Sequence, residues 1–300
     1  MTQLIPSNLP SIQALIARGA LFVVNHSGGK DSQAMYLKLR DLVPVQQLLI
    51  GHADLGEVEW AGAVDHIRKT TNGERIEICK ARRSLLEMID ERGMFPSPEQ
   101  RQCTSDLKRG PIERTIRRIV EERVAEFIGA PTSTGTLRMH GRAAAMEAGC
   151  GLIVNCMGMR AQESSGRKKL PMLKFSARNS KAGREWYDWL PIHAMLEDEV
   201  FSTIAAAGQV PHIVYSLGMR RFSCVFCIMA SEGDLKTAAR LATEQPELLN
   251  DPHLFRKYVG LEKKHNVVML MPSKSKGRRT LEEVTGILAG TSAYTGGIAA

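Results

Sequence analysis

A six-residue stretch near the N-terminus has the composition of a turn that binds phosphate groups. It reads Ser-Gly-Gly-Lys-Asp-Ser at 27–32, between an apolar run at 21–24 and a segment at 34–39 with the apolar spacing of a helix. Adjacent glycines let the backbone approach an anion, and the amides at the start of a helix supply donors and a positive dipole end. The predicted phosphate-binding residues are Ser27, Gly28, Gly29, Lys30, Asp31 and Ser32.

This stretch differs from the Walker P-loop, which has four residues between its first glycine and Gly-Lys-Ser/Thr. Here Lys30 follows two glycines directly, and Asp31 comes next. A simple glycine turn whose helix is capped by Asp31 or Ser32 is the alternative interpretation. The order of strand, loop and helix favours the phosphate site.

The second group of residues that could do chemistry consists of thiols. Cys224 and Cys227 are separated by two residues, a spacing at which both can ligate one metal or cluster. Cys103, in a loop after Pro96 and Pro98, is the expected third ligand. An iron–sulfur cluster of the [4Fe-4S] type is favoured and structural zinc is the alternative, while a redox dithiol or unliganded thiols stay open.

The other three cysteines follow a different pattern. Cys79, Cys150 and Cys156 lie on or beside predicted strands, where a cysteine usually behaves as a small buried apolar residue. Cys156 is the best of them for a fourth ligand, because it ends a strand near Arg160.

Composition narrows the class of protein. The chain has 300 residues, of which 43% are hydrophobic, and a formal net charge of +8. No apolar run approaches the roughly 18 residues that a membrane span needs, and the first residues lack the basic-then-apolar pattern of a signal peptide. We therefore expect a cytoplasmic protein without membrane contact, in which the cysteines are reduced, catalytic or metal-bound.

Positive charge is concentrated between residues 160 and 184. Glu163 is the only acidic residue of this segment, and its basic residues are Arg160, Arg167, Lys168, Lys169, Lys174, Arg178, Lys181 and Arg184. The segment is also rich in Gly, Ser and Asn, which predicts a mobile loop. We expect this basic loop to contact a polyanion, for which DNA, RNA and a small metabolite all stay open, although a solvated surface without a ligand is the alternative.

Apolar runs alternate with helical patterns along the first part of the chain. Strands are predicted at 21–24, 48–50, 75–79 and 152–154, and helices at 58–70 and 111–129. This alternation predicts an α/β fold, a doubly wound parallel sheet of Rossmann type. His26, Asp54 and Arg160 each follow a predicted strand, and ligands of such sheets bind beyond the carboxyl ends of the strands.

Three regions are expected along the chain. Residues 1–230 form the nucleotide-binding domain, and 231–289 form a helical C-terminal extension. Residues 290–300 are rich in Gly, Ala, Ser and Thr and are expected to be a disordered tail.

The stretch 27–32 resembles the PP-loop of the adenine nucleotide α-hydrolase superfamily, whose members split ATP between the α and β phosphates or handle adenylyl sulfates. The order of the remaining motifs is similar to that of the phosphoadenylyl-sulfate (PAPS) reductase family. Residues 53–56 resemble its Asp-Thr-Gly turn, and 103–108 resemble its Cys-Cys-x-x-x-Lys segment. Residues 158–167 resemble its Gly-x-Arg-x-x-x-Ser-x-x-Arg signature, and 215–227 its tyrosine-to-cysteine module.

Two departures from that pattern bear on the activity. The sulfonucleotide reductases of the family use a C-terminal cysteine as nucleophile, and this chain has no cysteine after Cys227. Gln102-Cys103 stands where the cluster-bearing reductases have two cysteines. The nucleotide half together with three thiols resembles the ATP pyrophosphatases of DNA phosphorothioation systems and is similar to the cluster-dependent tRNA thiolases.

The resemblance implies an enzyme that binds ATP, transfers its adenylyl group with release of pyrophosphate and couples this to sulfur transfer to a nucleic acid. A sulfur-donor protein is a further implied partner. Lys30, Asp31 and Arg160 would be catalytic, with Asp54 and Arg167 as further nucleotide contacts and Mg²⁺ beside Asp31 or Asp54. The alternatives are a sulfonucleotide reductase that releases sulfite and a non-catalytic nucleotide-binding subunit of a modification or defence complex.

Overall fold

The computed structural model describes residues 9–129, 141–272 and 275–289. The chain divides into two compact units, each built from several stretches. The first contains 1–54, 63–80 and 108–213, and the second contains 55–62, 81–107 and 214–300. This division does not coincide with the expected boundary at residue 230, because three stretches before that residue belong to the second unit. The expected tail at 290–300 lies outside the described residues.

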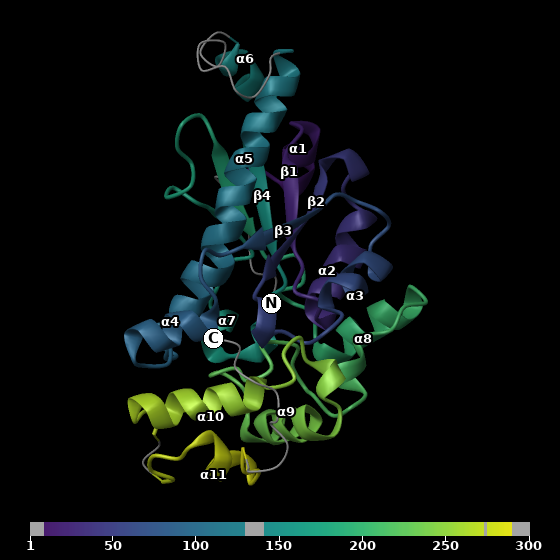
Figure 1. The fold of residues 1–300 in the computed structure, drawn as a ribbon. Coiled ribbons are helices and arrows are strands. Elements are labelled where there is room, and N and C mark those ends of the chain that lie inside the picture. The colour runs from purple at the N-terminus through teal and green to yellow at the C-terminus, as the bar shows by residue number, and fades with distance from the viewer. Residues whose placement is uncertain (1–8, 130–140, 273–274, 290–300) are drawn as a thin grey trace. The chain divides into compact units, whose positions relative to one another are not determined.

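A six-stranded sheet forms the centre of the first unit (Figure 1). Its strands are β1 (Leu21–Asn25), β2 (Leu48–Asp54), β3 (Ile76–Lys80), β4 (Leu152–Met157), β5 (Leu173–Phe175) and β6 (Glu185–Trp189). They lie in the order β3-β2-β1-β4-β6-β5, and all neighbours are parallel except β5, which is antiparallel to β6. The chain order reverses between β1 and β4, so the carboxyl end of β1 lies at the switch point where open α/β sheets bind ligands.

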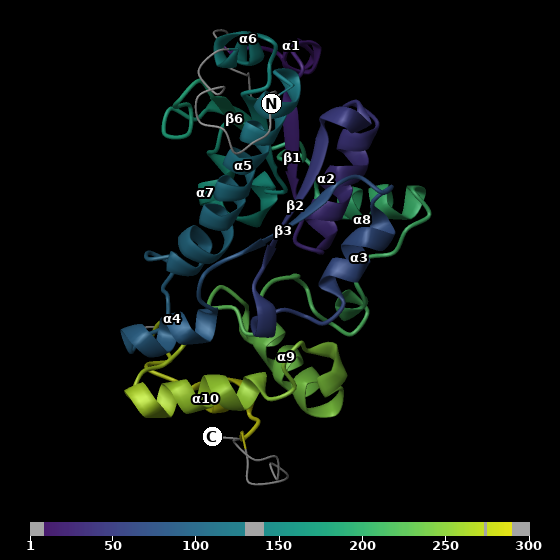
Figure 2. The ribbon, with the colours of Figure 1, turned by 45° about the horizontal axis from the view of Figure 1, so that its top comes forward.

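Helices cover both faces of this sheet, which confirms the predicted doubly wound α/β fold (Figures 1 and 2). One face carries α1 (Ile12–Ala17), α2 (Lys30–Arg40), α3 (Ala63–Thr70) and α8 (Glu197–Ala206), and the other carries α5 (Gly110–Phe127) and α6 (Arg142–Glu147). Phe22 and Val24 of β1 pack with the first group, whereas Leu21 and Val23 pack with the second. Since strand side chains alternate between faces, burial on both sides explains the continuous apolar run.

The regular structure in the described part of the second unit is helical. Its helices include α4 (Leu85–Arg92), α9 (Glu232–Glu244), α10 (Leu254–His265) and α11 (Leu281–Thr285), with short 3₁₀ helices η2 (Gly56–Val58) and η6 (Pro246–Leu248). Their apolar cluster includes Trp60, Phe226 and Tyr258, none of which is more than 1% exposed. The unit therefore has a core of its own.

The helix predicted at 58–70 is wrong in its first half, because α3 begins only at Ala63. Trp60 is fully buried and forms an antiparallel bridge with Leu249. Gly62 has a φ of +75°, a left-handed conformation that breaks a helix. Burial of the tryptophan, rather than local helix propensity, sets the conformation of this segment.

The segment 160–184, predicted as a mobile loop, contains regular structure. It includes η4 (Ala161–Glu163), α7 (Ser165–Lys168) and the edge strand β5. Leu173 of β5 is fully buried and lies opposite Trp189 of β6. One apolar residue among polar neighbours is too weak a signal to predict such a strand from the sequence.

None of the helices in the described ranges combines the length and the apolar character that crossing a membrane requires.

Candidate functional site

The loop predicted to bind phosphate lies at the carboxyl end of β1 and leads directly into α2. Gly28 has a φ of +86°, which glycine adopts without the steric cost of a side chain. The Ser32 hydroxyl donates to the Gly29 carbonyl (2.8 Å) and accepts from the Ser27 amide (3.2 Å). Nδ1 of His26 accepts a hydrogen bond from the Gly28 amide (3.1 Å). The loop is therefore held in shape by its own side chains.

The N-terminus of α2 is the anion-binding end of this loop. Gly29 is the N-cap residue, and no side chain of the described chain makes a capping hydrogen bond there. Such a helix end carries unsatisfied amides and roughly half a positive charge. Gly158, after β4, passes close to this turn, because a Cβ at that position would lie 3.3 Å from the backbone of Asp31 and Ser32. This close approach brings the chain that carries Arg160 to the helix start.

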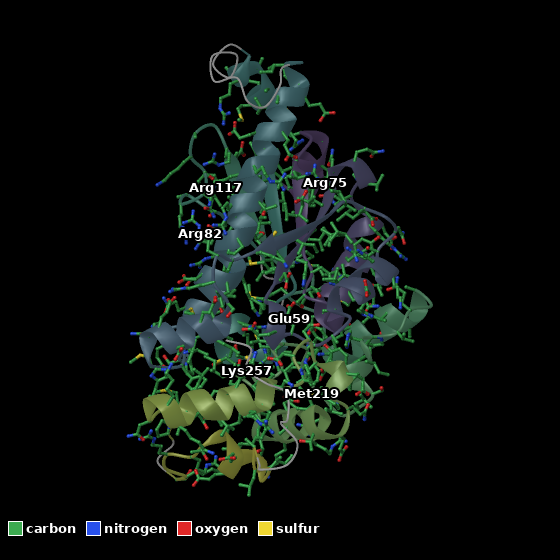
Figure 3. The ribbon with its side chains drawn as sticks, viewed as in Figure 1. Glu59, Arg75, Arg82, Arg117, Met219 and Lys257 are labelled. Carbon is green, nitrogen blue, oxygen red and sulfur yellow. The ribbon has the colours of Figure 1, made fainter. Side chains whose placement is uncertain are left out.

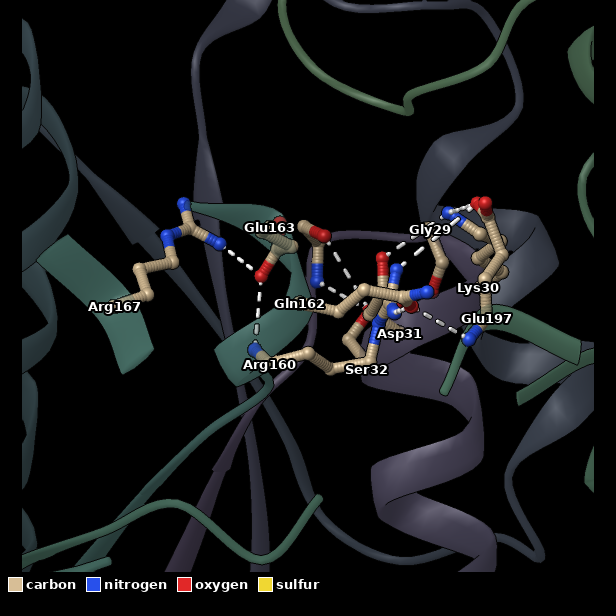
Figure 4. Close-up of polar contacts among 10 residues, drawn as sticks. Gly29, Lys30, Asp31, Ser32, Arg160, Gln162, Glu163, Arg167 and Glu197 are labelled. Carbon is tan, nitrogen blue, oxygen red and sulfur yellow. Dashed lines mark hydrogen bonds and ion pairs between the residues drawn. The ribbon is translucent and has the colours of Figure 1, made fainter. Parts of the chain in front are cut away.

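Two buried cations lie at this helix end (Figure 4). Lys30 is 2% exposed and Arg160 is 4% exposed. Lys30 Nζ lies 3.1 Å from Glu197 Oε1 and 3.3 Å from Asp31 Oδ2, and Arg160 Nε donates to Asp31 Oδ1 at 2.6 Å. Since buried charges require partners, Asp31 and Glu197 hold the two cations in position.

Arg167 joins the same network through Glu163. Its guanidinium donates to the Glu163 carboxylate, which also accepts a hydrogen bond from the Arg160 amide (2.9 Å). The structure thus brings Lys30, Asp31, Arg160 and Arg167 together through shared carboxylates. Lys30 and Arg160, the two cations at the uncapped helix end, could bind a polyphosphate, and Arg167 lies behind them on the far side of Glu163.

Asp54, another expected nucleotide contact, lies at the end of β2. Its carboxylate pairs with Nζ of Lys80, at 2.9 Å, and Lys80 ends the neighbouring strand β3. Hydrogen bonding to Asp54 raises the pKa of the exposed Lys80. Among the described residues no group of three or more His, Cys, Asp or Glu side chains is arranged to hold a metal ion. Mg²⁺ beside Asp31 or Asp54 therefore stays a prediction.

Sequence reasoning missed two residues of this network. Glu197, the first residue of α8, lies between Lys30 (3.1 Å) and Arg160 (4.0 Å). Gln162 accepts from Arg160 (2.7 Å) and from the Glu197 amide (2.9 Å). Three acidic residues begin α8, a pattern that stabilises any helix N-terminus. The sequence alone therefore does not distinguish Glu197 from its neighbours.

Glu197 competes with a phosphate group for Lys30. Replacing Glu197 with glutamine should strengthen the binding of pyrophosphate by roughly 2- to 5-fold, because a half-exposed ion pair contributes about 0.5–1 kcal/mol. Isothermal titration with pyrophosphate in the presence of EDTA measures this change. Asp198→Asn, at the exposed neighbouring position, is the control for net charge. Weaker binding to Glu197→Gln than to Asp198→Asn would show that the carboxylate assists the ligand instead.

His26 is uncharged in the folded protein, because burial, together with the nearby His52 and His66, lowers its pKa from 6.5 to about 3. As the pH falls, the unfolded state therefore takes up the proton first. The contribution of neutral His26 to the free energy of unfolding is therefore complete above pH 6.5 and declines below it. The decline amounts to about 2 kcal/mol between pH 7.5 and pH 5.

The variant His26→Asn tests this pH dependence, because an asparagine amide oxygen can accept the hydrogen bond that His26 Nδ1 takes from Gly28. Urea unfolding at pH 7.5 and pH 5 measures the free energy of unfolding at each pH. The decrease from pH 7.5 to pH 5 should be about 2 kcal/mol smaller for the variant than for the wild type. Equal losses in the two proteins would contradict the burial of a neutral His26.

The basic segment 160–184 has part of its charge in ion pairs. Arg178 lies 3.0 Å from Glu113 of α5. Arg117 of the same helix, labelled in Figure 3, lies 3.9 Å from Glu113. The exposed cations of the segment include Lys168, Lys169, Lys174 and Lys181. These lysines are the groups best placed to meet a polyanion in solution.

The three predicted metal ligands lie in the second unit and share its apolar cluster. Cys103 begins the π-helix η3 (Cys103–Arg109), a rare conformation that is frequent at functional sites. Cys224 and Cys227 precede α9, and Cys224 is 8% exposed. Burial raises the pKa of Tyr258 in α10, and the three nearby thiols raise it further. Thiols from two distant segments thus share one apolar cluster with Tyr258.

The surroundings of these thiols suit a thiolate-bound metal centre. The hydroxyl of Tyr258 is buried and has no hydrogen-bond partner among the described residues. Soft sulfur donors and a spare hydrogen-bond donor fit an iron–sulfur cluster or zinc. None of the six cysteines, all of them described, forms a disulfide. Because the described thiols do not form a group arranged around a single ion, ligation by Cys103, Cys224 and Cys227 stays a prediction.

The remaining cysteines belong to the core of the sheet. Burial raises the pKa of Cys79, Cys150 and Cys156. Cys156, the suggested fourth ligand, is fully buried and its thiol donates to the Val154 carbonyl (3.5 Å). Its position on β4 directs the side chain into the apolar cluster, so the structure does not support ligation by Cys156.

The sheet, with a glycine loop and buried cations at its switch point, defines an α/β nucleotide-binding protein. Residues 22–230 match the family model of the phosphoadenosine phosphosulfate reductase domain. The chain therefore belongs to the PAPS reductase family of the PP-loop superfamily, which confirms the resemblance of its motifs.

Individual relatives are distant. The chain is 25% identical over 151 residues to an uncharacterized 37.8 kDa protein in the gpa 5′ region of Escherichia phage 186, a match that covers 50% of this chain and 36% of that protein. The chain thus spans about a third of the length of that relative.

Two solved structures match the chain at low similarity. A PAPS reductase from Candida auris in complex with phosphate is 12% identical, with a TM-score of 0.43 over 73% of this chain and 97% of that chain. A mutant FMN adenylyltransferase from Candida glabrata is 12% identical, with a TM-score of 0.35 over 69% and 54%. The family assignment rests on the match over residues 22–230.

Proposed function

We propose that this protein binds ATP at the N-terminus of α2 and cleaves it between the α and β phosphates. The observation that carries this proposal is the convergence of buried Lys30 and Arg160 on an uncapped helix end. Lys30 and Arg160 pair with carboxylates in this structure, and the oxygens of a polyphosphate can take the place of those carboxylates. Membership of the PP-loop superfamily supports an adenine nucleotide as the ligand.

The proposed reaction is adenylyl transfer. An oxygen of the acceptor attacks the α-phosphorus, a P–O bond forms, and pyrophosphate leaves with the electrons of the broken bond. Lys30 and Arg160 stabilise the charge that grows on pyrophosphate, and Asp31 positions both cations through its two oxygens. Mg²⁺, if bound at Asp31 or Asp54, would neutralise further phosphate charge.

We propose a nucleic acid, DNA or tRNA, as the acceptor. The net charge of +8 and the exposed lysines of the segment 160–184 support a polyanionic partner. An adenylylated oxygen is a good leaving group. Sulfide from a donor protein can therefore attack the atom that carries this oxygen, and AMP departs with it. No oxidant or reductant is needed, because the sulfur stays at the oxidation level of sulfide.

The three thiols of the second unit support the sulfur half of this proposal. Cys103, Cys224 and Cys227 would hold the iron–sulfur cluster, with zinc as the alternative. A cluster with one iron not bound by cysteine would supply a position for sulfide.

Product analysis with labelled ATP tests the proposal. With γ-labelled ATP, label is expected in pyrophosphate, and with α-labelled ATP in AMP or in the nucleic acid. DNA or tRNA should stimulate both. Formation of ADP and orthophosphate would contradict cleavage at the α–β bond, and binding without turnover would indicate a non-catalytic subunit.

A sulfonucleotide reductase is the second candidate, because the family match itself favours it. Its assay is sulfite release from an adenylyl sulfate in the presence of thioredoxin. We expect no sulfite, since no cysteine follows Cys227 in this sequence. Sulfite release without any pyrophosphate release from ATP would replace the proposed activity with this one.

A further inference from the structure

The hydroxyl of Tyr258 is a polar group without an evident role in folding. Tyr258 is 1% exposed, and its hydroxyl makes no hydrogen bond to a described residue. A buried hydroxyl without a partner costs about 1–3 kcal/mol. A phenylalanine at this position of α10 would fill the same space without that cost.

The segments that carry the thiols also hold the tyrosine ring in place. Phe95, in the segment before Cys103, stacks on the ring with centroids 5.9 Å apart. Phe226, between Cys224 and Cys227, packs against it at 5.5 Å. All three thiols belong to the same apolar cluster as the ring. The ring is therefore held by the segments that carry the thiols, and its hydroxyl has no hydrogen-bond partner among the described residues.

We propose that the Tyr258 hydroxyl donates a hydrogen bond to sulfur in a metal centre bound by Cys103, Cys224 and Cys227. The acceptor is a ligand thiolate or a sulfide of the centre, since these charged sulfurs accept hydrogen bonds far better than a thiol does. The inference rests on the proposed thiolate-bound centre and adds a positioning residue that binds no metal itself.

Two consequences follow from such a hydrogen bond. The bond satisfies the hydroxyl only when the centre is bound, so Tyr258 stabilises the loaded protein and not the empty one. A hydrogen bond to sulfur also favours the more negative, reduced state of a cluster, and it therefore raises the reduction potential.

The variant Tyr258→Phe separates these effects from simple packing. Wild type and variant are compared without metal and after anaerobic reconstitution with ferrous iron and sulfide. Without metal the variant should melt at the same or a higher temperature than the wild type. With iron and sulfide it should melt at a lower temperature, release iron to a chelator roughly 10-fold faster, and have a lower reduction potential.

Tyr36→Phe is the matched control, because Tyr36 is also fully buried but its hydroxyl is satisfied. That hydroxyl donates to Glu74 (2.7 Å) and accepts from the Asn72 amide (2.8 Å). Tyr36→Phe should lower the melting temperature equally with and without metal. It should leave iron release and reduction potential unchanged.

The possible results distinguish this inference from the proposed centre. Wild-type protein that takes up neither iron and sulfide nor Zn²⁺ would overturn the centre and the inference together. A loaded wild type beside a Tyr258→Phe variant with unchanged iron release and potential would overturn the role of Tyr258 alone. If Tyr258→Phe lowers the melting temperature equally with and without the metal centre, the role of Tyr258 would also be overturned. If the centre is zinc, release of Zn²⁺ to a chelator replaces iron release as the measurement.

Discussion

Replacing Lys30 with methionine is expected to lower pyrophosphate release from ATP by about 10²- to 10³-fold, the usual effect of removing one group that stabilises a developing negative charge. Methionine keeps an apolar stem near Phe201, whose ring centroid lies 5.7 Å from Lys30 Nζ. Of the two partners left behind, Asp31 keeps its ion pair with Arg160, and Glu197 is half-exposed and can be solvated. The fold should therefore survive, and steady-state release of pyrophosphate measures the effect.

Lys38→Met is the control for this prediction. Lys38 lies on the same helix, is exposed, and donates to the Pro191 carbonyl (3.0 Å). The Lys38→Met variant should cleave ATP at the wild-type rate. Both this variant and Lys30→Met should keep the wild-type circular dichroism spectrum. Wild-type turnover by Lys30→Met would show that residues 27–32 form a turn without a catalytic role.

Replacing Cys227 with serine is expected to reduce the iron bound after anaerobic reconstitution by at least ~10-fold, because a serine hydroxyl is a poor ligand for a soft site. Cys103→Ser should have the same effect, although this residue comes from a distant segment. Iron and sulfide assays and the visible absorption spectrum measure the loss.

Cys150→Ala is the matched control for the thiol variants. Cys150 is 8% exposed. It packs in the apolar cluster of the first unit, whereas the predicted ligands belong to the second unit. This variant should bind as much iron as the wild type. Full iron content in Cys103→Ser would remove that residue from the ligand set, and full content in both serine variants would contradict a cluster bound by Cys103 and Cys227.

Local sequence signals were sufficient to predict the centre of the fold. β1, its loop and α2 follow from the apolar run at 21–24, the two glycines and the helical spacing after them. Each of these elements is determined mainly by residues that are neighbours in the chain. The position of Arg160 beyond β4 followed from the same logic. The parallel order then brought Lys30 and Arg160 to one edge of the sheet.

Long-range packing decided what the sequence could not predict. Trp60 lies outside the helix because it pairs with Leu249, far along the chain. Glu197 reaches Lys30 because α8 packs on α2, and the spacing of acidic residues at a helix start does not reveal this. The relation of Tyr258 to the thiols likewise depends on a core assembled from separate stretches.

The most direct test of nucleotide binding at α2 is a crystal structure with the non-cleavable analogue α,β-methylene ATP. The β and γ phosphates are expected at the amides of Gly29 to Asp31, with Lys30 and Arg160 bound to phosphate oxygens and the Glu197 carboxylate displaced from Lys30. Phosphates bound elsewhere, with the Lys30–Glu197 pair intact, would contradict this assignment.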